Sequence, residues 1–251
     1  RASQLAFVAC SEALAQSGLL VDPVRADRGR IGVFGGIGFG GALSVDATYT
    51  RYHQALATGR NPSVMHPLSV PRIMANAPVA SVSMKHGLRG STYTYSVACA
   101  SSAVALGEAM RAIRHGWLDA AVVFGTEAMI APVAYMAWNA LRVLAKADGS
   151  MVSESCRPFD KQRNGFVLGE GAACLVLERA ELARARLARP LAELCGYGTS
   201  SDATHLTAPS QEGQERAMRD ALMDAGLPPG DIGYLNAHGT ATDTGDIIES
   251  R

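Results

Sequence analysis

The amino-acid sequence predicts an α/β fold in which helices cover a β-sheet. Segments with helical periodicity alternate along the chain with short apolar runs that are typical of buried strands. The sequence also contains an internal echo, since "ALAQSGL" leads to "IGVF" (13–19 and 31–34) and "ALMDAGL" leads to "IGYL" (221–227 and 232–235). This echo indicates two similar halves, of which the second is expected to be truncated because less chain follows it.

In the first half, caps, periodicity and residue type predict the elements. Ser3 is expected to cap a helix that Gly18 ends, and Gly87 and Gly116 follow two further helices. In chain order, the segments are helix 3–20, strand 30–36, helix 77–88, strand 91–99, helix 100–115 and strand 119–128.

The rest of the chain has a weaker pattern. Residues 146–165 are polar and rich in helix breakers, which predicts a long loop. Segment 169–190 is expected to form a strand and then a helix that ends before Pro190. Segment 190–210 is expected to start as a strand and become a loop, and segment 212–240 to form a helix, a turn, a strand and a turn.

Composition and charge argue against several classes of function. The 23 basic and 23 acidic residues balance, so nucleic-acid binding has no electrostatic support. No apolar run reaches about 18 residues, and the start of the chain lacks the features of a signal peptide, so neither a membrane span nor secretion is expected. The glycine run 34–41 lacks the lysine of a phosphate-binding loop, so nucleotide binding is rejected.

The cysteines indicate a reducing compartment. They number five, with irregular spacing and no C-x-x-C pair, which argues against a zinc site or a disulfide framework and favours the cytoplasm. Four of them are expected to be small buried hydrophobes. These four are Cys10, Cys156, Cys174 and Cys195.

Cys99 differs from the others because it lies where an expected strand meets an expected helix. The unpaired N–H groups of the first helical turn and the positive end of the helix dipole favour a thiolate there. The same N–H groups can stabilise an oxyanion on an attacked carbonyl. Two interpretations stay open at this point: a nucleophile, or a buried cysteine in an alanine-rich helix.

His238 is the second candidate. It lies in "NAHGTATDTGD" (236–246), after an expected strand, and strand ends are where sites collect in α/β sheets. Imidazole donates protons and hydrogen bonds near neutral pH, so Cys99 and His238 could act as a nucleophile–imidazole pair. The alternative is a turn in which the histidine is merely hydrogen-bonded. A third segment, "RPFDKQRNGFVLGEGA" (157–172), either packs beside the site or forms a surface loop with ion pairs.

Together these segments resemble the β-ketoacyl-acyl carrier protein synthases, the condensing enzymes of fatty acid and polyketide synthesis. "VACASSAVALGEAMRAIRHG" is similar to their nucleophile motif, "RPFDKQRNGFVLGEGA" to their central signature and "NAHGTATDTGD" to their first histidine motif. The resemblance covers essentially the whole chain. It implies the thiolase-like fold, a duplicated five-layer α-β-α-β-α sandwich. The expected halves are residues 1–170, without the first strand, and residues 171–251, the truncated start of the second half.

The resemblance also implies roles for single residues. Cys99 matches the nucleophile that accepts the acyl chain as a thioester, and its own N–H matches one oxyanion donor. His238 matches the first of two histidines that assist decarboxylation of the malonyl unit. Thr240 and Thr242 match the threonines that hydrogen-bond the phosphopantetheine arm.

Two further matches and two absences complete the resemblance. Glu249 matches an acid that supports a lysine near the site, and Trp138 falls where an aromatic residue lines the acyl pocket. No "KSMTGH"-like motif, which contains the family's lysine and second histidine, occurs in the sequence, and no "GFGG"-like motif follows the first histidine motif. The chain is therefore expected to be incomplete at both ends.

The implied function is that of a 3-oxoacyl-acyl carrier protein synthase, an acyltransferase. It would condense an acyl thioester on Cys99 with malonyl-carrier protein, with loss of carbon dioxide. No metal and no cofactor of its own is expected, because the substrates are carried on the phosphopantetheine of acyl carrier protein. The expected partners are that carrier and a second copy, which pairs through "STYTYSVA". A thiolase-like acyl-CoA transferase and a non-catalytic chain-length partner subunit stay open as alternatives.

Overall fold

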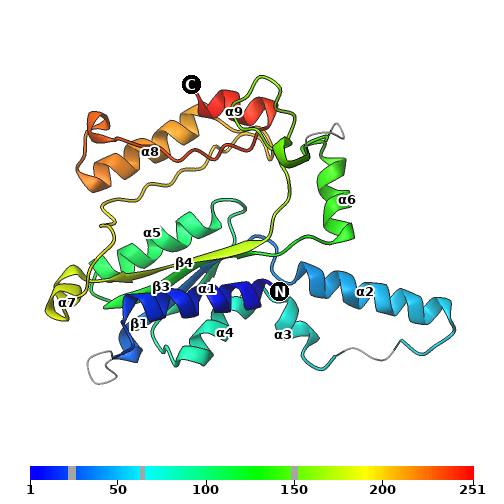
Figure 1. The fold of residues 1–251 in the computed structure, drawn as a ribbon, viewed down its shortest axis with the longest axis horizontal. Coiled ribbons are helices and arrows are strands. Elements are labelled where there is room, and N and C mark those ends of the chain that lie inside the picture. Colours follow the sequence, from blue (N-terminus) through cyan, green and yellow to red (C-terminus); the bar gives the residue numbers. More distant parts are fainter. Residues whose placement is uncertain (22–26, 63–65, 148–151) are drawn as a thin grey trace. The chain divides into compact units, whose positions relative to one another are not determined.

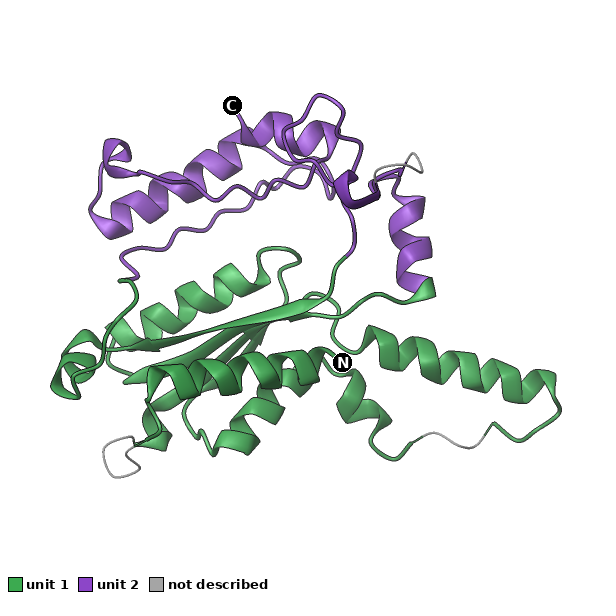
Figure 2. Cartoon of the chain, viewed as in Figure 1, with its two compact units in different colours: residues 1–132, 169–193 green, residues 133–168, 194–251 purple. Residues whose placement is uncertain are grey.

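The computed structural model describes residues 1–21, 27–62, 66–147 and 152–251. Contacts divide the chain into two compact units, which are described separately below (Figure 2). Unit 1 comprises residues 1–132 and 169–193, and unit 2 comprises residues 133–168 and 194–251. These units reflect spatial clustering, whereas the expected halves (1–170 and 171–251) concern internal duplication, which stays a prediction.

A four-stranded sheet with the strand order β2-β1-β3-β4 forms the centre of unit 1 (Figure 1). Its strands are β1 (Ile31–Gly36), β2 (Thr92–Tyr95), β3 (Ala120–Glu127) and β4 (Gly171–Glu178). β1 pairs in parallel with both β2 and β3, and β4 runs antiparallel to β3. All four strands lie inside segments predicted to contain them. Because β1, β2 and β3 are parallel, their carboxyl ends lie at one edge of the sheet, where the segment containing Cys99 begins.

Helices cover both faces of this sheet, as predicted. α1 (Ala2–Ser17) and α4 (Ala77–His86) pack on one face, and α5 (Ser101–Arg114) packs on the other (Figure 1). Alternate residues of β3 enter the two cores: Val122 and Phe124 face α1 and α4, whereas Ala121 and Val123 face α5. β1 and nearly all of β3 are therefore buried.

Glycines end α1 and α4 as predicted. Gly18 and Gly87 both have a φ of 63°, the left-handed conformation that a glycine adopts without steric cost. The predicted cap at Ser3 is wrong, because α1 begins at Ala2 and no side chain caps it. Ser3 lies within the first turn instead.

Among the described residues, four helices have no counterpart in the sequence predictions. They are α2 (Ala42–Ala57), α3 (Ser69–Ile73), α6 (Pro132–Ala140) and α9 (Asp243–Glu249). α2 buries none of its residues, so it lacks the apolar stripe by which a packed helix is identified. α3 is five residues long, little more than one turn. The helix predicted before Pro190 is confirmed as α7 (Ala180–Ala185).

Unit 2 contains the predicted helix α8 (Gln211–Ala225) and the short helix α9 (Asp243–Glu249). The strands predicted at the start of 190–210 and within 212–240 are wrong, because no strand is assigned to these residues. Instead, residues 196–198 lie against α8, where a Cβ on Gly196 would be 2.4 Å from the Ala221 oxygen. A strand needs a partner ladder, and these segments have none among the described residues.

Most of the predicted loop 146–165 is confirmed, with one 3₁₀ turn at Val152–Glu154; residues 148–151 lie outside the described residues. Two more 3₁₀ turns occur, at Arg28–Arg30 and Pro229–Asp231. No helix in the described ranges is long and apolar enough to cross a membrane. In the same ranges, no cluster of three or more His, Cys, Asp or Glu side chains could hold a metal ion.

The carboxylate of Asp119 ties three strand ends of unit 1 together. It accepts hydrogen bonds from Arg30 at 2.7 and 2.9 Å and from Arg179 at 2.5 Å. Arg30 precedes β1, Asp119 precedes β3 and Arg179 follows β4. The hydrogen bonds from Arg30, with the charges of both guanidinium groups, hold the pKa of Asp119 below its usual value.

Substitution of this carboxylate is expected to make the stability depend less on pH. A carboxyl group whose pKa is lowered by folding stabilises the protein above its unfolded pKa of about 3.9. That stabilisation is lost as the pH falls through the folded pKa. Asp119→Asn should therefore lower the free energy of unfolding by about 1 kcal/mol at neutral pH. Chemical denaturation should show this difference shrinking below about pH 4, with the exposed Asp231→Asn as control; a difference that is constant with pH would contradict the assignment.

Candidate active site

Cys99 lies on a tight turn between β2 and α5, as predicted. The residue before it, Ala98, has a φ of 47°, a conformation that non-glycine residues rarely adopt. The buried hydroxyl of Ser101 closes the turn, because it accepts from Val97 N at 2.8 Å and donates to Ala98 O at 2.6 Å. Cys99 itself is exposed. The interpretation as a cysteine buried in the helix is therefore wrong.

Two glycines let the start of α5 approach the sheet. A Cβ on Gly36, at the end of β1, would lie 2.4 Å from backbone atoms of Ser101 and Ser102. A Cβ on Gly125 of β3 would lie 2.8 Å from the Ser102 side chain. Only glycine leaves room for these contacts. The two glycines therefore allow the first turn of α5 to pack directly against the carboxyl ends of β1 and β3.

A carboxylate at the end of β3 fixes the neighbouring loop. Glu127 accepts hydrogen bonds from the N–H groups of Gly38 and Phe39 at 3.0 and 2.9 Å. Ser96, three residues before the cysteine, donates to the Gly38 oxygen at 3.3 Å. These contacts join the loop after β1 to the segment that leads into the Cys99 turn. Sequence reasoning missed Glu127, although an acid that ends an apolar strand is a visible signal.

The other four cysteines differ in exposure. Cys10 is buried, as expected, whereas Cys174 is only half-buried. The expectation of burial is wrong for Cys156 and Cys195, which are exposed. These two lie in irregular segments of unit 2, which do not enter a core. A hydrogen bond with Cys174, together with burial, raises the pKa of the Cys10 thiol far above its usual value. Cys10 should therefore be inert in the folded protein.

In unit 2, a carboxylate holds the backbone of His238. Glu249, the last residue of α9, accepts a hydrogen bond from His238 N and another from Gly239 N at 2.8 Å. Gly239 has a φ of 52°, so the turn after the histidine depends on a glycine conformation. The side chain of His238 is exposed. Glu249 thus orients the histidine segment directly, a contact that the resemblance does not imply.

Thr240 and Thr242 lie side by side. Their hydroxyl oxygens are 3.0 Å apart. Thr242 is also the N-cap of α9, since its hydroxyl accepts from Gly245 N at 3.3 Å. The residue between them, Ala241, is fully buried with a φ of 60°, and its N–H donates to Asp246 at 3.0 Å.

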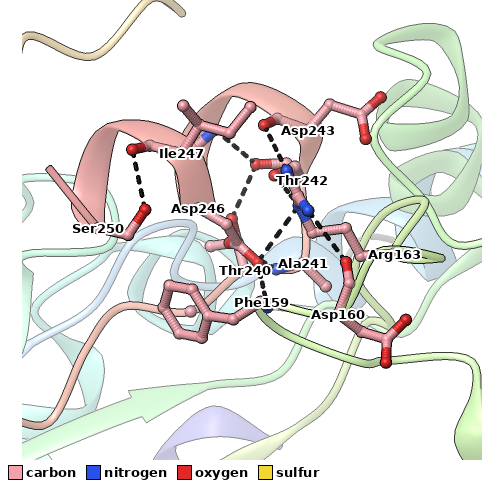
Figure 3. Close-up of polar contacts among 12 residues, drawn as sticks. Phe159, Asp160, Arg163, Thr240, Ala241, Thr242, Asp243, Asp246, Ile247 and Ser250 are labelled. Carbon is pink, nitrogen blue, oxygen red and sulfur yellow. Dashed lines mark hydrogen bonds and ion pairs between the residues drawn. The ribbon is translucent and has the colours of Figure 1, made fainter.

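The buried Asp246 joins this segment to the central signature. Its side chain is 2% exposed, and it accepts from Ala241 N at 3.0 Å and from Phe159 N at 2.6 Å (Figure 3). Arg163 lies 3.6 Å from the same carboxylate. The segment 157–168 therefore packs against the histidine segment instead of forming only a surface loop. The burial of Asp246 is not predicted, because nothing in the sequence "TDTGD" distinguishes a buried aspartate from an exposed one.

Trp138 lies on α6, where its ring stacks edge-on against Phe166 at a centroid distance of 5.4 Å. The indole is half-buried. Unit 2 thus contains His238, Thr240, Thr242, Glu249 and Trp138, whereas Cys99 belongs to unit 1. The catalytic and binding roles of these residues stay predictions.

Comparison with known families covers almost the whole chain. Residues 1–183 match the N-terminal domain of β-ketoacyl synthase, and residues 191–251 match its C-terminal domain. The chain belongs to the β-ketoacyl synthase family. The predicted resemblance is therefore confirmed, and the motifs around Cys99 and His238 lie in the two matched domains of this family.

Individual relatives support the assignment to this family. A curated 3-oxoacyl-[acyl-carrier-protein] synthase 2 of Staphylococcus aureus is 41% identical over 251 residues, which is 99% of this chain and 60% of the relative. The crystal structure of a β-ketoacyl synthase from Burkholderia phymatum STM815 aligns with a TM-score of 0.89 at 36% identity, covering 100% of this chain and 59% of that one.

A third similarity is to a solved ketosynthase complex. The structure of a type II PKS acyl-carrier protein with its ketosynthase aligns with a TM-score of 0.94 at 30% identity, over 99% of this chain and 61% of that one. These structures confirm the predicted thiolase-like α/β fold. The chain spans about three fifths of the length of the relatives that it matches.

Proposed function

We propose that the whole protein is a 3-oxoacyl-acyl carrier protein synthase that works by decarboxylative Claisen condensation. The observation that carries this proposal is the exposed Cys99 on a strained turn at the start of α5, in a chain of the β-ketoacyl synthase family. A turn of this kind presents a sulfur atom beside unpaired helical N–H groups, which suits a nucleophile.

In the first stage, Cys99 accepts the acyl chain. The thiolate attacks the carbonyl carbon of an acyl thioester, the bond to the carrier sulfur breaks, and the carrier leaves as a thiol after it takes up a proton. Backbone N–H groups at the start of α5 stabilise the oxyanion that forms on the carbonyl. Thr240 and Thr242 bind the phosphopantetheine arm, and Trp138 lines the acyl pocket.

In the second stage, malonyl-carrier protein loses carbon dioxide, and the electron pair of the broken bond forms an enolate. His238 donates a hydrogen bond to the thioester oxygen, where negative charge develops. The enolate carbon then attacks the acyl carbonyl, a carbon–carbon bond forms and the Cys99 thiolate leaves. The product is a 3-oxoacyl-carrier that is two carbons longer than the acyl chain.

Two alternatives are less favoured. A thiolase-like acyl-CoA transferase would use the same cysteine without decarboxylation, but the "NAHGT" segment fits the condensing enzymes better. A non-catalytic chain-length partner subunit would not need an exposed cysteine on a strained turn. The first alternative predicts a product that forms without loss of carbon dioxide, and the second predicts no product.

We further propose acyl carrier protein and a second copy of the chain as partners, and the cytoplasm as the location. β2 lies at the edge of the described sheet, and its Tyr93 is 54% exposed, which suits pairing with the same strand of another copy. The protein needs no cofactor of its own, because carbon dioxide is lost from an activated thioester. A monomer in solution-mass measurements would contradict the dimer.

The proposed function is tested with the whole protein, an acyl-carrier protein and malonyl-carrier protein. Mass spectrometry should detect a 3-oxoacyl-carrier two carbons longer than the starting acyl chain, together with release of carbon dioxide. Product formation from acyl-CoA without carbon dioxide release would favour the thiolase-like alternative, and no turnover would favour the chain-length partner.

The contact of Glu249 with the backbone of His238 and Gly239 makes a separate prediction. Glu249→Gln removes the charge and one of the two acceptor oxygens, so the decarboxylation rate should fall about tenfold to a hundredfold. The acylation rate of Cys99 should stay within about twofold of the wild type, since Cys99 lies on a different segment. Glu212→Gln, on the exposed side chain of α8, is the matched control. Equal losses in both half-reactions would show that Glu249 acts through general stability instead.

A further inference from the structure

Arg163 makes an unusual set of contacts within unit 2. Its Nε donates to the Thr242 oxygen at 3.2 Å, one terminal nitrogen donates to the Asp243 oxygen at 3.0 Å and the other donates to the Asp160 oxygen at 2.9 Å (Figure 3). The side chain is only 15% exposed. One guanidinium group therefore joins three backbone carbonyls from two segments that are about 80 residues apart in sequence.

The charge and the shape of this side chain serve different contacts. The positive charge lies 3.6 Å from the carboxylate of Asp246, which is 2% exposed and needs a compensating partner. The planar fork, by contrast, reaches the three carbonyls in three directions, which a lysine ammonium on a flexible stem does not reproduce. Replacement by lysine therefore separates the two effects, since the charge is kept and the fork is lost.

The guanidinium group of Arg163 fixes the backbone next to the pair of threonines, Thr240 and Thr242. Arg163 holds the carbonyls of Thr242 and of the next residue, Asp243, at the point where α9 begins. Threonine has few side-chain rotamers, so the direction of its hydroxyl follows from its backbone. The hydroxyl of Thr242 in turn lies 3.0 Å from that of Thr240.

We propose that Arg163 is a positioning residue for the phosphopantetheine arm: it sets the orientation of the Thr240–Thr242 pair from the central signature. The inference rests on the proposed function, in which this pair binds the arm. Arg163 contacts no reacting atom in this scheme. It should therefore matter only for substrates that carry the arm.

The same loop contains a matched control. Arg157 is also half-buried, but its hydrogen bonds go to Glu154 O at 2.9 Å and Gln162 Oε1 at 3.1 Å, both within the loop. Among the described residues, Arg157 has no hydrogen bond or ion pair with the histidine segment. Arg157→Lys thus changes the same residue type in the same loop without touching the threonine pair.

The test compares two acyl donors on the whole protein. Octanoyl-pantetheine carries the arm, whereas p-nitrophenyl octanoate does not, and acylation of Cys99 is followed by intact-protein mass for both. Arg163→Lys should lower the acylation rate from octanoyl-pantetheine about tenfold, the equivalent of one hydrogen bond, and change the rate from the nitrophenyl ester by less than about twofold. Arg157→Lys should change neither rate.

A double-mutant cycle makes the result more specific. In a Thr240→Val background, Arg163→Lys should have little additional effect on the pantetheine donor, because the pair that it orients is already broken. Arg163→Gln, which keeps two N–H donors, replaces the lysine variant if that protein shows no cooperative melting. Equal losses with both donors, no loss with either, or additive effects in the cycle would overturn the proposal. Failure of the proposed function is distinct, since the wild type would then not be acylated at Cys99 by either donor.

Discussion

Cys99→Ser is expected to reduce the condensation rate of the whole protein by about a thousandfold or more. A hydroxyl is a far weaker nucleophile than a thiolate at neutral pH. The backbone N–H groups at the helix start stay in place. The loss should therefore appear in the acylation step, which single-turnover mass spectrometry measures directly.

The control for this variant is Cys195→Ser, another exposed cysteine in an irregular segment. It should keep the wild-type rate within about twofold. A Cys99→Ser protein that retains a substantial fraction of its activity would remove Cys99 from the reaction. Comparable losses in both variants would indicate that the assay reports on folding instead of on the nucleophile.

Gly36→Ala is expected to be the most damaging small substitution in unit 1. The added methyl group would lie 2.4 Å from backbone atoms of Ser101 and Ser102, where no flexible side chain can yield. The start of α5 must then shift, and the turn that carries Cys99 shifts with it. We expect a loss of about 3 kcal/mol in the free energy of unfolding and a large loss of acylation.

Gly171→Ala is the matched control, since it also adds a methyl group to a strand of the same sheet. Nothing lies within 4 Å of a Cβ at Gly171. Its stability in chemical denaturation should stay within about 0.5 kcal/mol of the wild type. If the two variants were equally stable, the close seating of α5 on β1 would be wrong.

The sequence predicts unit 1 well because its elements are determined by local signals and by burial. β1 and β3 are buried apolar runs, and α1 and α4 end at Gly18 and Gly87, which the chain needs in a left-handed conformation. α2 is missed because it buries no residue, so no apolar stripe marks it. The expected strands of unit 2 do not form, since strand assignment depends on a partner that local pattern cannot supply.

The candidate site is predicted in part. Cys99 is found because a strand end followed by small residues is visible in the sequence, and His238 is found because the motif around it resembles that of the family. Asp246 and Arg163 are not assigned to positions around them, because their importance comes from backbone contacts across long separations. Arg163 reaches Thr242, and Asp246 reaches Phe159, at separations of 79 and 87 residues. Only the folded chain shows which of many polar residues make such contacts.

The central claim is tested most directly by finding where the acyl group is attached. The whole protein is incubated with an acyl-carrier protein, quenched in acid and digested, and the peptides are mapped by mass spectrometry. The account predicts one acyl thioester, on the Cys99 peptide, which malonyl-carrier protein then removes as the longer 3-oxo product. An acyl group on any other cysteine, or an unmodified Cys99 during turnover, would contradict it.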